Sequence, residues 1–182
     1  MVIGYYSIIK ENLVQEKDGN ILEIGEKCGT LIRKYDKWRN KIMRAEFDET
    51  LVTGNDMIDS QHKELIDRIN QLLESCEDGQ GKVKAVKMLD YLLDYTVFHF
   101  EAEEKLQEEI QYPGIQEHKA KHAEFKQAVK ELQEMLEEEE GPTEAFVAQV
   151  QKNVVDWLYD HIKGFDRSVA EYKFMASNTD RL

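Results

Sequence analysis

The run HKAKHAEFKQAV spans residues 118–129 and places two histidines four residues apart. Because an α-helix has about 3.6 residues per turn, His118 and His122 share one helix face with Phe125 and Val129. The opposite face carries lysine, glutamate and glutamine, which favours an amphipathic helix with its histidines turned inward. We therefore predict a helix over residues 115–139, which ends before Gly141 and Pro142.

The same periodicity predicts three more helices on either side of this run. One covers residues 56–75, one covers residues 83–110, and one begins near Thr143, which would cap it. Turn-forming residues separate the helices at 78–81, 112–114 and 141–142. The turn at 112–114 is short, so the helices beside it are expected to be antiparallel neighbours. The chain is thus predicted to be all-α, with a four-helix bundle over residues 46–182.

Residues 1–45 are predicted to form an N-terminal extension with an amphipathic helix near residues 21–43. Its apolar stripe alternates spacings of three and four residues along Ile21, Ile24, Cys28, Leu31, Tyr35, Trp38 and Ile42. Such a stripe either docks on the bundle, or pairs with a second copy of the chain or with a partner protein.

The composition limits the classes of partner and location. The 182 residues include 24 Lys and Arg against 37 Asp and Glu, a net charge of −13. An acidic surface repels phosphate backbones and anionic lipids, so neither a nucleic-acid nor a membrane partner is expected. No stretch approaches the roughly 20 apolar residues of a membrane span. The two cysteines, Cys28 and Cys76, fit a reducing compartment, so a cytoplasmic location is predicted.

All five histidines lie on the predicted inward faces, where an unpaired imidazole would cost free energy. Two carboxylates accompany them, because Glu103 lies four residues after His99 and Asp166 lies five residues after His161. His62 completes the set from the first helix of the predicted bundle. Seven such groups exceed what one tetrahedral or octahedral ion takes, which indicates a pair of metal ions. The mixture of imidazole and carboxylate suits iron, although affinity order alone leaves zinc and copper open.

Four motifs resemble the signature of the bacterial hemerythrin family. They are IDSQHKEL at 58–65, HFEAEE at 99–104, YP at 112–113 followed by His118, His122 and Phe125, and WL at 157–158 followed by His161, Ile162 and Asp166. The resemblance covers residues 50 to about 170 and implies an up-down-up-down bundle. It also implies two iron ions (Fe²⁺/Fe³⁺), joined by an oxo or hydroxo bridge and by the carboxylates of Glu103 and Asp166.

The resemblance further implies an unequal division of the imidazoles. One iron would be held by His118, His122 and His161, and the other by His62 and His99, with one open position. In similar proteins molecular oxygen binds reversibly at that position. The expected function is therefore that of a non-haem oxygen carrier, store or sensor. It is not expected to be an enzyme, beyond weak oxidase or peroxidase activity.

An apolar wall is expected to keep water and protons away from the open position. The candidates for this oxygen pocket are Trp157, Leu158, Leu65 and Ile115. Asp59, three residues before His62, is expected to be an exposed carboxylate at the helix start, or else to accept an imidazole N–H.

Two other functions stay open from the sequence. A di-iron oxidoreductase could reduce peroxide, nitric oxide or O₂ at such a site. Ferritin-like di-iron enzymes build their sites on Glu-x-x-His motifs, however, and this chain has none. The other alternative is an iron-binding signalling module that acts through the stripe at residues 21–42.

Overall fold

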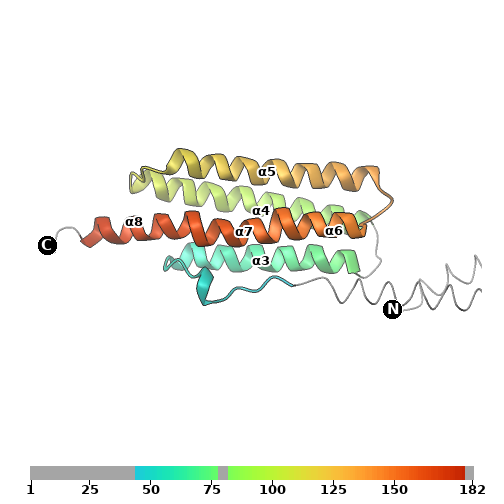
Figure 1. The fold of residues 1–182 in the computed structure, drawn as a ribbon, viewed down its shortest axis with the longest axis horizontal. Helices are drawn as coiled ribbons and strands as arrows, with labels where there is room; N and C mark the ends of the chain where they lie inside the picture. The colour runs from blue at the N-terminus through green and yellow to red at the C-terminus, as the bar shows by residue number, and fades with distance from the viewer. Residues whose placement is uncertain (1–43, 78–81, 179–182) are drawn as a thin grey trace, which may run out of the picture. The chain divides into compact units, whose positions relative to one another are not determined.

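The computed structural model describes residues 44–77 and 82–178, and helices make up nearly all of this part of the chain (Figure 1). A short 3₁₀ turn, η1 (Glu49–Leu51), precedes three uninterrupted α-helices: α3 (Asp56–Glu77), α4 (Lys82–Glu109) and α5 (Ile115–Glu138). The fourth helix of the bundle is continuous but changes character along its length, as α6 (Glu144–Val150), η2 (Gln151–Asp156), α7 (Trp157–His161), η3 (Ile162–Asp166) and α8 (Arg167–Asn178). Within the described residues there is no β-strand.

The four helices lie side by side, and successive helices run in opposite directions (Figure 1). Helix α3 packs on α4, α4 packs on α5, and the fourth helix packs on both α5 and α3, which closes the bundle. The predicted all-α, up-down-up-down four-helix bundle is confirmed. No helix in the described part of the chain is both long and apolar enough to cross a membrane.

The predicted helix limits agree with the structure within two residues. The predicted cap at Thr143 is also confirmed, since its side-chain oxygen accepts a hydrogen bond of 3.1 Å from the Phe146 N–H. This bond satisfies one of the N–H groups that lack a partner inside the helix.

The fourth helix departs from the prediction in its winding. Both η2 and η3 are π-helical segments, in which hydrogen bonds close over five residues and not over four. Phe165 was expected to point inward, but it is only half-buried, whereas Ile162 and Asp166 are buried. The predicted inward stripe of this helix is confirmed by four buried residues, Phe146, Val150, Val154 and His161, and only Trp157 and Phe165 are half-buried, because each π turn shifts the face that follows it.

The predicted core faces of α3 and α5 are buried throughout, which confirms them. On α4 the buried face is shifted from the predicted one, because it takes in Ala85, Phe100 and Gln107. Three residues that were expected to be inward on this helix are only half-buried: Val86, Leu93 and Leu106. The buried face of α4 therefore contains more polar atoms than its apolar stripe indicates.

The predicted N-terminal helix and its stripe, including Cys28, lie outside the described residues. The last residues of the predicted extension are described. Ala45 is buried and exchanges two hydrogen bonds of 2.9 Å with the Asn70 side chain on α3. Cys76 is buried near the end of α3, where its thiol donates a hydrogen bond of 3.2 Å to the Leu72 carbonyl.

Candidate metal centre

The five histidines converge in the interior of the bundle, and none is more than 3% exposed. Each helix contributes: His62 comes from α3, His99 from α4, His118 and His122 from α5, and His161 from α7. Glu103 on α4 and Asp166 in η3 lie among them and are also buried. All seven residues that the sequence singled out are thus brought together.

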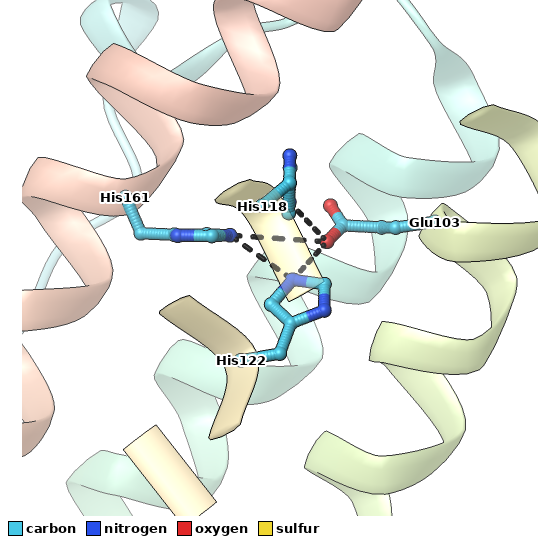
Figure 2. A group of neighbouring side chains, drawn as sticks. All are labelled: Glu103, His118, His122 and His161. Atoms are coloured by element: carbon cyan, nitrogen blue, oxygen red, sulfur yellow. Dashed lines mark hydrogen bonds and ion pairs between the residues drawn. The ribbon is translucent and has the colours of Figure 1, made fainter. Parts of the chain in front are cut away.

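Three imidazoles gather on one oxygen of Glu103, and we call them the three-imidazole group (Figure 2). Glu103 Oε2 lies 3.2 Å from His122 Nε2, 3.5 Å from His118 Nε2 and 4.0 Å from His161 Nε2. The Nε2 atoms of His122 and His161 are themselves 3.2 Å apart. These four side chains offer one atom each within a space that could hold a single metal ion.

The remaining imidazoles gather on the other oxygen of Glu103, and we call them the two-imidazole group. Glu103 Oε1 lies 3.4 Å from His99 Nε2 and 3.6 Å from His62 Nε2. Asp166 is divided in the same way: Oδ2 lies 3.2 Å from His62, and Oδ1 lies 3.3 Å from His118 and 3.2 Å from His161. Each carboxylate therefore directs one oxygen toward each group of imidazoles.

Buried nitrogen and oxygen atoms without hydrogen-bond partners indicate whether the cluster fits a metal ion. Among the described residues, several buried atoms have no hydrogen-bond partner, and most of them face the centre of the cluster. They include Nε2 of His62, His99 and His118, Oε2 of Glu103 and both carboxylate oxygens of Asp166. Burying such atoms without partners is costly, whereas metal ligation satisfies them. The donor set, imidazole nitrogen and carboxylate oxygen, fits iron and other divalent transition metals.

Burial and charge act on the imidazoles in opposite directions. Burial lowers the pKa of His99 to about 4, since the nearby Glu103 does not compensate for it. At His62 and His161 burial also acts to lower the pKa, but Asp166 and Glu103 outweigh it and raise both values to about 9. The pKa values of the two carboxylates are held below their ordinary range by the surrounding imidazoles, against the effect of burial.

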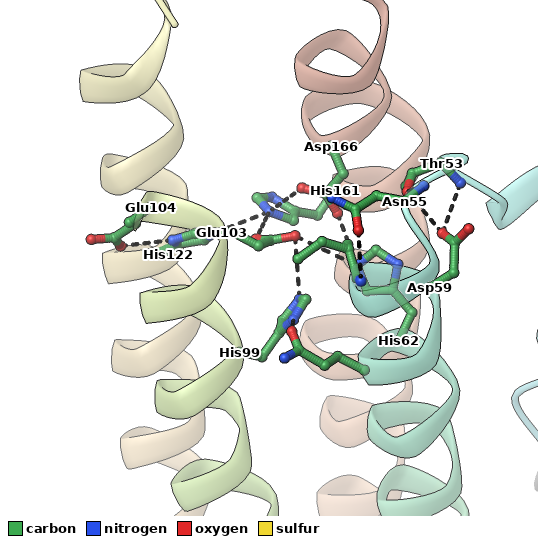
Figure 3. Close-up of polar contacts among 12 residues, drawn as sticks. Thr53, Asn55, Asp59, His62, His99, Glu103, Glu104, His122, His161 and Asp166 are labelled. Atoms are coloured by element: carbon green, nitrogen blue, oxygen red, sulfur yellow. Dashed lines mark hydrogen bonds and ion pairs between the residues drawn. The ribbon is translucent and has the colours of Figure 1, made fainter. Parts of the chain in front are cut away.

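Two polar side chains outside the cluster fix the orientation of two imidazoles (Figure 3). Gln61 Oε1 lies 3.0 Å from His99 Nδ1, and Glu104 Oε1 lies 2.9 Å from His122 Nδ1. When Nδ1 carries the proton, Nε2 is left free to bind a metal. Sequence reasoning missed both residues. The only signal was their position next to a candidate ligand, Gln61 before His62 and Glu104 after Glu103.

Aromatic rings cover the three-imidazole group. Phe100 stacks on His122 with ring centroids 3.6 Å apart and planes 4° from parallel. Trp157 and Phe165 lie nearly parallel to the His161 ring, with centroids 4.5 Å and 5.5 Å away. Of the residues predicted to line an oxygen pocket, Leu158 and Leu65 are buried, while Trp157 and Ile115 are half-buried.

A cavity of about 320 Å³ reaches the cluster at the end of the bundle where α3 begins and α4 and α8 end; we call it the carboxylate cavity. Its buried lining includes Glu103, His118 and Asp166. None of the four residues predicted to form the oxygen pocket lines it. The cluster therefore has one face under aromatic rings and another beside an opening.

Asp59 differs from both roles expected of it. It is 7% exposed, and it accepts hydrogen bonds from the Thr53 N–H and hydroxyl, both 2.8 Å, and from the Gly54 N–H at 3.2 Å (Figure 3). Gly54 has a φ of +84°, which a residue with a side chain adopts only under strain. Asp59 thus fixes the turn that leads into α3, and the expectation of an exposed carboxylate was wrong.

Comparison with known proteins agrees with the cluster. Residues 53–172 match a family model described as the hemerythrin HHE cation binding domain. The chain is 30% identical to a bacteriohemerythrin of Stenotrophomonas maltophilia, over 69% of this chain and 78% of that one. It is 31% identical to a myohemerythrin of Riftia pachyptila, over 66% of this chain and 86% of that one. A crystal structure of wild-type hemerythrin superposes with a TM-score of 0.55 at 29% identity, covering 63% of this chain and 85% of that chain.

Proposed function

This chain belongs to the hemerythrin family of HHE cation-binding domains, and we propose that it binds two iron ions and, through them, molecular oxygen reversibly. His118, His122 and His161 would hold one ion, and His62 and His99 the other. Glu103 and Asp166 would bridge the pair, together with an oxo or hydroxo group. The names of the related proteins, bacteriohemerythrin and myohemerythrin, support this assignment.

The observation that carries the proposal is the division of the two carboxylates. Glu103 directs Oε1 toward the two-imidazole group and Oε2 toward the three-imidazole group, and Asp166 is divided in the same way. A carboxylate that serves a single ion has no reason to face two sets of nitrogen donors. Two carboxylates that do so together fit a pair of ions held side by side.

The unequal number of imidazoles would leave the two ions with different numbers of open coordination positions. With two carboxylates and a bridging oxygen, three imidazoles complete the roughly six positions of an octahedral ion, whereas two imidazoles leave one position over. The ion of the two-imidazole group would therefore be the one that accepts oxygen. The iron pair would supply the two electrons that reversible oxygen binding requires.

The chain's own side chains support this role. Gln61 and Glu104 hold the His99 and His122 rings through Nδ1, which keeps Nε2 directed at the centre. Phe100, Trp157 and Phe165 shield the three-imidazole group from water. Trp157 stacks on His161, which belongs to the three-imidazole group and not to the ion with the open position, so its role in the wall of the oxygen pocket stays a prediction.

The test is an absorption spectrum of the iron-loaded, reduced protein before air, after air, and after oxygen is removed again. We expect an absorption band that appears with oxygen and disappears when the oxygen is withdrawn, through several cycles. An irreversible change in the first cycle, or steady consumption of oxygen or peroxide, would instead favour the di-iron oxidoreductase. Binding of fewer than two irons per chain would contradict the proposal.

The physiological use of oxygen binding, as carrier, store or sensor, belongs to the same proposal. A signalling role through the stripe at 21–42, and pairing of that stripe with a second chain, stay predictions, because those residues lie outside the described part of the chain. The cytoplasmic location also stays a prediction.

A further inference from the structure

The carboxylate cavity connects the surface of the bundle to the two bridging side chains. At its outer rim Gly54, Lys173, Phe174 and Ser177 are exposed. The deepest residues are nearly or fully buried: Ile58, Glu103, Gln107, His118, Asp166 and Val169. Exposure therefore falls from rim to floor, and the floor includes three of the groups that would hold the metal pair: Glu103, His118 and Asp166.

The opposite side of the cluster is covered. Phe100 lies 3.6 Å from the His122 ring centroid, and Trp157 and Phe165 lie nearly parallel to the His161 ring. A second cavity in the described part of the chain, between α4 and α5 beside Val86 and Lys130, contacts none of the seven candidate ligands. An ion approaching through the aromatic rings would have to displace them and lose its water before it met a ligand.

The lining of the carboxylate cavity has the chemistry that an entering cation needs. Thr53, Asn55 and Gln107 line the cavity with polar side chains. The Thr53 hydroxyl donates to Asp59, and Asn55 Oδ1 accepts from backbone N–H groups at the start of α3, so Gln107 supplies the available neutral oxygen. Gln107 is 1% exposed, and its Oε1 is buried without a hydrogen-bond partner among the described residues. The volume of about 320 Å³ has room for roughly ten waters at about 30 Å³ each, more than the shell of a hydrated divalent ion.

We propose that the carboxylate cavity is the passage by which divalent metal ions reach and leave the centre, which rests on the proposed function. An ion enters with its water shell, exchanges a water for Gln107 Oε1, and is then taken by Glu103 and Asp166. The imidazoles bind last. Lys173, the one lysine or arginine that residues 44–77 and 82–178 contribute to the lining, opposes the entering charge at the rim.

A passage has a kinetic signature that a ligand does not have. Narrowing it slows entry and exit by the same factor and leaves the affinity unchanged, because it changes only the barrier. Ala170 lines the cavity and is not among the candidate ligands, so Ala170→Leu adds bulk to the passage without removing a donor. The matched control is Ala148→Leu on the exposed face of α6.

The experiment follows Co²⁺ uptake by the metal-free full-length chain in a stopped-flow spectrometer, and Co²⁺ release to a chelator. We expect Ala170→Leu to slow both steps by tenfold or more, with two Co²⁺ per chain still bound at equilibrium, and Ala148→Leu to behave as the parent chain. Three results would overturn the proposed passage. Ala170→Leu could leave both rates unchanged, Ala148→Leu could slow them by the same factor, or Ala170→Leu could bind less Co²⁺ at equilibrium. If the parent chain binds fewer than two Co²⁺, the proposed function fails as well.

A charge variant tests the same passage without changing its width. Lys173→Glu should accelerate Co²⁺ uptake by about threefold at low salt, since a field of one sign focuses an approaching ion, and the gain should vanish near 1 M salt. Lys87→Glu carries the same change in charge, but it lies 16 residues before Glu103 on α4, about 24 Å away along the helix axis. Equal acceleration in both variants, or none in Lys173→Glu, would contradict the proposal.

Discussion

The two groups of imidazoles are held in different ways. In the three-imidazole group, His122 is backed by the Glu104 carboxylate and stacked on Phe100, and His161 lies between Trp157 and Phe165. In the two-imidazole group, His99 is backed by the neutral amide of Gln61. Among the described residues Nδ1 of His62 has no partner, and the same is true of Nδ1 of His118 and His161 in the other group. The two groups thus differ in the stacked aromatic rings and in the charge of the side chain that backs one imidazole. This difference suits a pair of ions of which one stays fully ligated and the other exchanges a ligand.

The largest effect on both groups of imidazoles is expected from removing a side chain that they share. Because Glu103 faces both, Glu103→Ala should weaken both metal positions by more than about 100-fold, a larger loss than outer partners typically give. Metal titration followed by elemental analysis measures it. Glu101→Ala, on the exposed side of α4, is the control and should bind two ions. Retention of one ion at full affinity would show that Glu103 serves a single position.

Removing a ligand from one group should affect that group alone. His99→Ala leaves Glu103, His118, His122 and His161 complete, so the variant should keep one ion per chain. It should also lose the oxygen-dependent absorption band, because the ion with the open position is gone. Loss of both ions would show that the three-imidazole group does not hold a metal by itself.

Substitution of the side chains that bind the Nδ1 atoms should have smaller effects, each confined to one group of imidazoles. Gln61→Leu should weaken the two-imidazole position, and Glu104→Leu the three-imidazole position, each by about 10–100-fold, the usual cost of losing a group that orients a ligand. Stepwise Zn²⁺ titration by calorimetry resolves which position weakens. The same position weakening in both variants would contradict the separate roles of these side chains.

Protonation of the imidazoles is expected to have the smallest effect on stability, and this effect should have opposite signs in the metal-free and the metal-loaded chain. The pKa values of His62 and His161 are raised from 6.5 to about 9, so their charged forms stabilise the metal-free fold fully below pH 6.5. That stabilisation is lost as the pH rises through 9. Metal ligation needs neutral imidazoles, so the loaded chain should gain stability over the same range.

Two measurements check this reversal. The unfolding midpoint of the metal-free chain should fall between pH 6.5 and 9, while that of the Zn²⁺-loaded chain should rise. Zinc binding at pH 7 should also release at least about two protons, from His62 and His161 and in part from His118, whose pKa is also raised by Asp166 and Glu103 against the effect of burial, as measured by calorimetry in buffers of different ionisation enthalpy. Release of no protons would mean that these imidazoles are already neutral.

The sequence predicted the parts of this structure that follow from helical periodicity. The inward faces of α3 and α5, the shared face of His118 and His122, and the cap at Thr143 all depend on residues within a few turns of one another. Contacts between distant residues were less accessible. Gln61 pairs with a histidine 38 residues away, and no local pattern distinguishes it from a surface glutamine.

The errors have similar causes. Asp59 resembles an exposed carboxylate at a helix start, but the turn at Thr53 and Gly54 folds back and buries it. Phe165 was placed inward by an α-helical repeat that η2 and η3 interrupt. The five-residue spacing of His161 and Asp166 was the one local sign of that interruption.

The π-helical segment η3 begins directly after His161 and ends at Asp166. Because one π turn closes over five residues, it brings these two side chains to the same side of the helix, which an α turn would not do. The site should therefore depend more on the number of residues between His161 and Asp166 than on which residues they are. Exposed residues between His161 and Asp166, such as Lys163 and Gly164, can be exchanged for others that tolerate a helix. The deletion or insertion of a single residue there would leave every candidate ligand in the sequence and yet separate Asp166 from His161.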